Sequence, residues 1–168
     1  MKSTKKLAVL SIYTVVALTI FVVESAIPLP IPIPGIKLGL ANIITLIVLC
    51  NYRPSDAFIV LFARILLSSL FSGQMMTLFY SALGGLFCFC VMYSINRILA
   101  GHFLFITSIF GALAHNAGQL LAAWLIVRNP GILTYVPFLT ISGIVTGLFT
   151  GLCAHYAQKY LLPHIKRQ

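Results

Sequence analysis

Residues 103–127 read FLFITSIFGALAHNAGQLLAAWLIV, a run without a single Lys, Arg, Asp or Glu. About 20 apolar residues in a helix cross the hydrocarbon core of a bilayer, so an uncharged run of this length is typical of a transmembrane helix. Its most polar side chains, His115, Asn116 and Gln119, lie together near its centre. The stretch therefore predicts a membrane-spanning helix that carries polar groups at membrane depth.

The rest of the chain has the same apolar character. Of its 168 residues, 60% are hydrophobic and only 8% are charged, and the mean hydropathy is +1.05. Soluble domains are far less apolar and carry about three times this share of charge. We predict a single domain over residues 1–168 that is integral to the cytoplasmic (inner) membrane, with lipids as its surroundings.

Six apolar runs are long enough to be helices, near residues 7–27, 36–50, 56–72, 75–96, 103–127 and 136–160. The second and third runs are short for a full crossing, and a re-entrant hairpin is the alternative there. Six crossings are the prediction, and the fold class is an all-α membrane protein, a six-transmembrane-helix bundle.

The first two predicted helices are joined by a proline-rich stretch, residues 27–35, which reads IPLPIPIPG. Proline has no amide hydrogen and fixes its backbone angle, so this stretch is predicted to be extended and semi-rigid. It is also apolar, unlike a solvated linker. We expect it to lie over the protein as a lid or wall.

The basic residues predict the orientation and argue against a nucleic-acid partner. The net charge is +9, but the cations punctuate the apolar runs and form no patch with interleaved aromatics. Lys37 and Arg128 fall on one side of the predicted membrane. Eight fall on the other, which the positive-inside rule makes cytoplasmic together with both termini: Lys2, Lys5, Lys6, Arg53, Arg97, Lys159, Lys166 and Arg167.

Arg64 is the charged residue in the most costly position. It lies eight residues into the third predicted helix, roughly 12 Å deep at about 1.5 Å per residue. A charge at that depth costs at least about 2.5 kcal/mol and needs a partner. The partner is either Glu24, in a structural ion pair, or an anionic ligand in a cavity.

Two further polar groups are candidates for the same cavity. His115 and Gln119 are one turn apart on one helix face, and Asn116 lies about 100° around from His115. Lys37 and Asn42 open the second predicted helix, directly after the proline-rich stretch. The alternatives are hydrogen bonds between helices, a packing asparagine and a lysine that snorkels to the interface.

The sequence offers little material for catalysis. It has two acidic residues, Glu24 and Asp56, and shows no phosphate-binding loop, no Asp-rich motif and no zinc motif. We predict a protein that is not an enzyme and has no catalytic residues, cofactor or metal.

The last predicted helix carries Gly143, Gly147 and Gly151, one every four residues. Such a strip lets another helix approach closely. It is predicted to serve packing inside the bundle, with docking of a partner protein as the alternative.

Four stretches together resemble the Gx transporter family, a family also named heptaprenyl diphosphate synthase component I. The stretches are PGIKLGLAN at 34–42, ARILLSSL at 63–70, SALGG at 81–85 and GALAHNAGQ at 111–119. The family is similar in turn to the S components of energy-coupling factor (ECF) transporters. That resemblance implies a six-helix bundle that binds a small molecule at the outer face, and partners that comprise a transmembrane T component and ATPase subunits.

Three functional hypotheses follow. The first is a transport subunit that captures a small anionic or amphiphilic molecule through substrate-binding residues Lys37, Asn42, Arg64, His115, Asn116 and Gln119. The second is a non-catalytic accessory subunit of isoprenoid or quinone metabolism, in which the same cations hold a diphosphate or a quinone. The third is a scaffold for a membrane redox or transport complex, with the glycine strip as its docking face.

Overall fold

The computed structural model describes residues 3–27, 37–73 and 75–161. Within these ranges the chain forms six α-helices and no strand. A 3-10 helix, η1 (Pro130–Tyr135), leads into the last α-helix, and a π-helical turn, η2 (Ala157–Leu161), follows it. The α-helices are α1 (Ser3–Ser25), α2 (Asn42–Asn51), α3 (Pro54–Ser72), α4 (Met75–Ile98), α5 (Leu104–Val127) and α6 (Val136–Tyr156). The predicted all-α membrane bundle is confirmed.

The second helix is shorter than predicted. Five of the described helical segments have the length and apolar composition to cross a membrane, and α2 is not among them. With 10 residues α2 rises about 15 Å, half of the hydrocarbon core. The predicted helix over 36–50 begins too early, because residues 37–41 form no helix and Gly39 has a positive φ of 81°. The full sixth crossing is thus replaced by a half-length helix.

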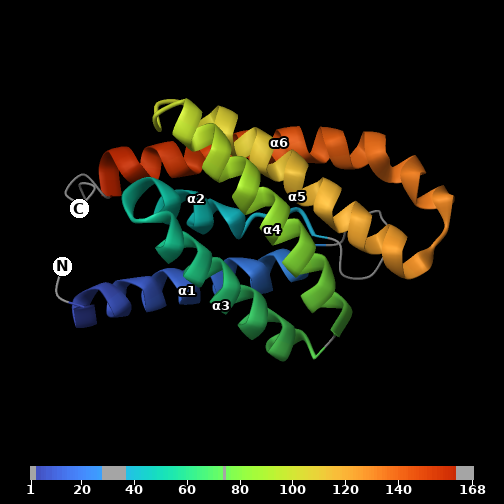
Figure 1. The fold of residues 1–168 in the computed structure, drawn as a ribbon, viewed down its shortest axis with the longest axis horizontal. Helices are drawn as coiled ribbons and strands as arrows, with labels where there is room; N and C mark the ends of the chain where they lie inside the picture. The colour runs from blue at the N-terminus through green and yellow to red at the C-terminus, as the bar shows by residue number, and fades with distance from the viewer. Residues whose placement is uncertain (1–2, 28–36, 74, 162–168) are drawn as a thin grey trace.

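The short α2 lies in the middle of the bundle (Figure 1). It contacts α1, α3, α4, α5 and α6, and eight of its ten residues are buried. Around it, α1 packs on α3, α3 on α4, α4 on α5 and α5 on α6. The start of α1 and the end of α6 lie at the same end of the bundle (Figure 1).

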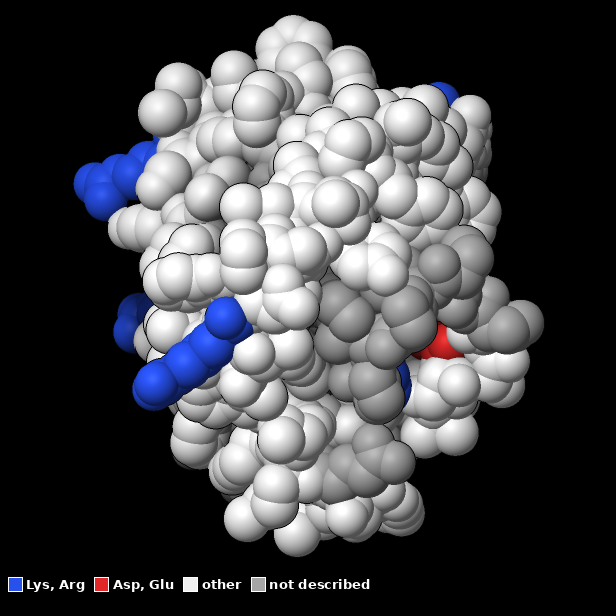
Figure 2. Space-filling view, turned by 90° about the vertical axis from the view of Figure 1, so that its right-hand side faces the viewer, with Lys and Arg blue, Asp and Glu red and all other residues white. Residues whose placement is uncertain are grey.

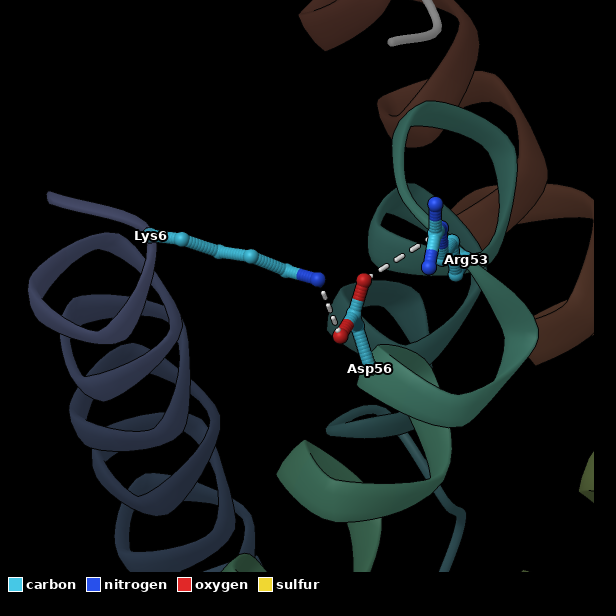
Figure 3. A network of polar contacts seen from close by, with 3 residues as sticks. All are labelled: Lys6, Arg53 and Asp56. Atoms are coloured by element: carbon cyan, nitrogen blue, oxygen red, sulfur yellow. Dashed lines mark hydrogen bonds and ion pairs between the residues drawn. The ribbon is translucent and has the colours of Figure 1, made fainter. Parts of the chain in front are cut away.

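Two ionised side chains connect α1 to the start of α3 (Figure 3). Pro54 occupies the first turn of α3, where its missing N–H is not needed. The Asp56 carboxylate accepts the backbone N–H of Arg53 at 3.1 Å and thereby caps the helix. Its other oxygen lies 2.8 Å from Nζ of Lys6 in α1. This ion pair holds the two helices together at the end where α1 begins.

The glycine strip of α6 packs inside the protein. A Cβ atom added to Gly147 would lie 2.6 Å from Cα of Ile109, and one added to Gly151 would lie 2.6 Å from Cα of Phe105. Both neighbours belong to the backbone of α5, so only glycine permits this approach. The packing interpretation accounts for the strip, and α5 occupies the face that a partner protein would need.

The outside of the bundle is apolar. Large hydrophobic side chains are exposed on the long helices, for example Leu7 at 66%, Leu70 at 77% and Val145 at 62%. The end of the molecule drawn in Figure 2 is also almost wholly uncharged, with isolated basic side chains and a small acidic patch. Such a surface is stable in contact with lipid and not with water.

Candidate functional site: a buried polar cluster

Six polar residues from four helices and one loop meet inside the bundle. We call them the polar cluster: Glu24 (α1), Lys37 (loop), Asn42 (α2), Arg64 (α3), His115 and Gln119 (α5). All except Lys37 are at most 4% exposed. Burying this many polar groups is costly unless they are hydrogen-bonded or bind a ligand. The contacts of each member therefore show what the cluster can do.

Arg64 forms a single described hydrogen bond. Its Nη2 atom donates to Oδ1 of Asn42 at 3.2 Å, and its Nε atom has no acceptor among the described residues. Among the described residues the ion pair joins Lys6 and Asp56. No carboxylate of these residues lies within ion-pair distance of the Arg64 guanidinium. The predicted alternative of a direct Arg64–Glu24 ion pair is therefore not what the structure contains.

The Glu24 carboxylate is occupied by the loop that precedes α2. One oxygen accepts the N–H of Gly39 at 2.5 Å, and the other accepts the N–H of Leu40 at 3.1 Å. Backbone amides are good partners for a carboxylate because the bonds are charge-assisted. Glu24 thus fixes the loop against α1.

Lys37 is held by α1 and α5. Its ammonium group lies 3.2 Å from the ring centre of Phe21 and donates to Oγ of Ser25. Its backbone N–H donates to the Gln119 side-chain oxygen at 3.3 Å. In the alternative amide orientation, which satisfies both ends of the Gln119 side chain, the Gln119 nitrogen donates to the Lys37 carbonyl at 2.9 Å. In that orientation the Gln119 oxygen accepts from Lys37 N–H at 3.2 Å and from Nε2 of His115 at 3.1 Å.

Two glycines make room for the His115 ring. A Cβ atom on Gly39 would lie 2.7 Å from Cδ2 of His115, and one on Gly84 of α4 would lie 2.9 Å from Cε1. The ring therefore sits between the loop and α4, with no space for a larger residue on either side. Its Nδ1 atom is buried and has no hydrogen-bond partner among the described residues.

Asn116 lies apart from the cluster. It is 4% exposed, and its amide nitrogen donates to the carbonyl of Leu139 in α6 at 2.7 Å. The 100° between neighbouring helical residues turns it toward α6, while His115 and Gln119 face the loop and α4. The structure thus brings together five of the six predicted site residues and places the sixth in a contact between α5 and α6.

Three residues of the site had no predicted role in it. Gly39 and Gly84 both make room for His115, a contact that no local sequence pattern reveals. Glu24 entered the sequence argument only as a rival partner for Arg64. One signal could have assigned it to the site. Of the two acidic residues, Glu24 is the one whose predicted position is inside a transmembrane helix.

The cluster has the chemistry of an anion site. Two cations, Lys37 and Arg64, face one carboxylate, Glu24, so the ordinary charges sum to +1. Two buried donors, Nδ2 of Asn42 and Nε of Arg64, have no acceptor among the described residues. Within the described residues no group of three His, Cys, Asp or Glu side chains could hold a metal ion. Oxygen atoms of a small anion would match these donors.

The proline-rich stretch, which was predicted to cover the bundle, falls on residues that are not described, 28–36. The described chain stops at Ile27, the first residue of the stretch and three residues after Glu24, and it resumes at Lys37, within the cluster.

Comparison with known sequences identifies a family. Residues 13–157 match the family described as heptaprenyl diphosphate synthase component I. None of the curated proteins or solved structures compared with the chain matches it. Because the family match extends over most of the chain, from the first helix to the last, this protein belongs to the heptaprenyl diphosphate synthase component I family.

Proposed function

We propose that the protein is a non-enzymatic, substrate-binding subunit of a membrane transport system, similar to the S components of ECF transporters. It captures a small anionic or amphiphilic molecule at the outer face of the cytoplasmic membrane. Lys37, Asn42, Arg64, His115 and Gln119 bind the molecule. Asn116, the remaining candidate, positions α5 through its bond to α6.

The incomplete coordination of Arg64 carries this proposal. A fully buried guanidinium has five N–H donors, and here one of them reaches a neutral amide oxygen. A structural arginine at this depth would be expected to bind a carboxylate directly. Glu24 lies in the same cluster but is bound to backbone amides instead. An anionic ligand group is the partner that satisfies Arg64 and Asn42 together.

The proposal assigns the remaining parts of the transport cycle to other elements. The gate, predicted to be the proline-rich stretch, lies outside the described residues. Transfer into the cell depends on a T component and ATPase subunits, because the chain has no ATP-binding segment of its own.

The family description favours a second candidate function. The description names a component of a heptaprenyl diphosphate synthase. In this second proposal the protein is a non-catalytic accessory subunit that holds a prenyl diphosphate in the membrane for a catalytic subunit. The same donors of Arg64 and Asn42 would then bind the diphosphate. The two functions differ in the ligand and in the partner protein.

Native mass spectrometry of the gently solubilised protein tests the proposal and separates the two candidates. We expect a bound small anion, water-soluble or amphiphilic, at one copy per chain, and co-purification with a T component and ATPases. A retained long-chain prenyl diphosphate together with a synthase subunit would support the accessory function instead. A protein that retains nothing, and binds no anion added back, would contradict both.

The proposed orientation gives a separate prediction. In a background that lacks the four native cysteines, single cysteines at Gly73 and Asn129 should react with a membrane-impermeant maleimide in intact cells. Cysteines at Lys2 and Arg167 should react only after permeabilisation, because the basic residues favour the cytoplasm. Labelling of position 73 only after permeabilisation would show that the orientation is reversed.

A further inference from the structure

An apolar groove runs along the side of the bundle between α3 and α4. Its volume is about 240 Å³, and its walls include Leu61, Phe62 and Ile65 from α3 and Ala82 and Leu86 from α4. Phe62 and Leu86 are 54% and 45% exposed, whereas Leu61 and Ile65 are buried at its floor. In a membrane the groove would therefore open sideways into the lipid, not toward water.

The floor of the groove is next to the polar cluster. Leu61 and Ile65 are one turn apart on α3, and Arg64 lies on the same buried face. All three converge on Gly85 of α4, where an added Cβ atom would lie 3.1 Å from Leu61, 3.0 Å from Ile65 and 3.8 Å from Nη2 of Arg64. The apolar floor and the charged end of Arg64 thus meet at one glycine.

This juxtaposition matches the two ends of an amphiphile. The guanidinium provides donors for a charged head, and the groove provides an apolar surface on which a hydrocarbon chain can lie. Lipid tails are as apolar as leucine, so the groove contributes packing and placement of the chain, not a hydrophobic driving force.

We propose that the ligand is a single-chain anionic amphiphile that enters sideways from the bilayer, its chain in the α3–α4 groove and its head at Arg64. This inference rests on the proposed anion-binding function and specifies the class of molecule. The groove is then a specificity element, because it distinguishes an anion that bears a chain from one that does not.

The test uses two probes with related heads, dodecyl phosphate and inorganic phosphate, and protein in lipid nanodiscs, with empty nanodiscs as the blank. Wild-type protein should bind dodecyl phosphate more tightly than phosphate. Ala82→Phe, which fills the groove, should lower the affinity for dodecyl phosphate roughly tenfold or more and leave the affinity for phosphate unchanged. Arg64→Gln should weaken both probes.

The control is Ala8→Phe, the same change at an exposed position of α1, which should alter neither affinity. Ala82→Leu, a smaller insertion, repeats the test if Ala82→Phe does not fold. Two results would contradict the groove proposal but not the anion site. One is an unchanged dodecyl phosphate affinity in a folded groove variant, and the other is equal binding of the two probes to wild-type protein. Failure of both probes to bind wild type would overturn the anion site itself, and the groove proposal with it.

Discussion

Replacement of Gly147 by leucine is expected to lower the melting temperature and the yield of the purified protein sharply. The first atom of the new side chain alone would lie 2.6 Å from the backbone of α5 at Ile109 and 3.0 Å from the carbonyl oxygen of Ser108. Backbone atoms of a packed helix cannot rotate away as a side chain can, so α6 must move. Overpacking of this kind costs roughly 1–3 kcal/mol or more.

Val145→Leu is the matched control, since Val145 is on the same helix and is 62% exposed. It should leave the melting temperature unchanged within a degree or two. Thermal unfolding in detergent, followed by size-exclusion chromatography, measures both variants. Equal stability of Gly147→Leu and wild type would show that α6 does not pack on α5 through this strip.

Arg64→Gln is expected to give a folded, monodisperse protein that has lost ligand binding by roughly 10- to 100-fold. A hydrogen bond to a charged group contributes about 1.5–3 kcal/mol, and the anion loses at least one such bond. The fold should survive because the carboxylate of Glu24 keeps its bonds to Gly39 and Leu40, and Lys37 remains near it. Stability and retention of the co-purifying molecule are measured on the same preparation.

Arg128→Gln provides the control, because Arg128 is an exposed cation at the end of α5 and lies outside the cluster. Its loss should change neither stability nor retention. The opposite result for Arg64 has a clear signature. If Arg64→Gln were unstable, if adding Glu24→Gln restored stability, and if the double variant bound ligand normally, Arg64 would be a structural partner of Glu24 and not a ligand residue.

The sequence by itself determined that the surroundings are lipid, that the chain is helical, and which residues form most of the polar cluster. Long uncharged runs require helices in a bilayer because every backbone amide must be satisfied within its own segment, and this rule is local. A charge or amide inside such a run is costly wherever the run goes, so Arg64, His115 and Gln119 could be identified without a fold. The glycine strip likewise indicated that another helix packs closely against α6, but it did not indicate which helix.

The tertiary structure decided how the polar residues are paired. The apolar pattern of residues 37–41 is compatible with a helix, but the Glu24 carboxylate binds the amides of Gly39 and Leu40 and keeps this segment in a loop. That bond joins residues far apart in the sequence, so no local pattern encodes it. Asn116 and His115 are neighbours in the sequence and face different helices, because 100° of rotation separates them. Whether Arg64 has a carboxylate partner depended on the same long-range contact, since a charge is paired by what lies within a few ångströms in space.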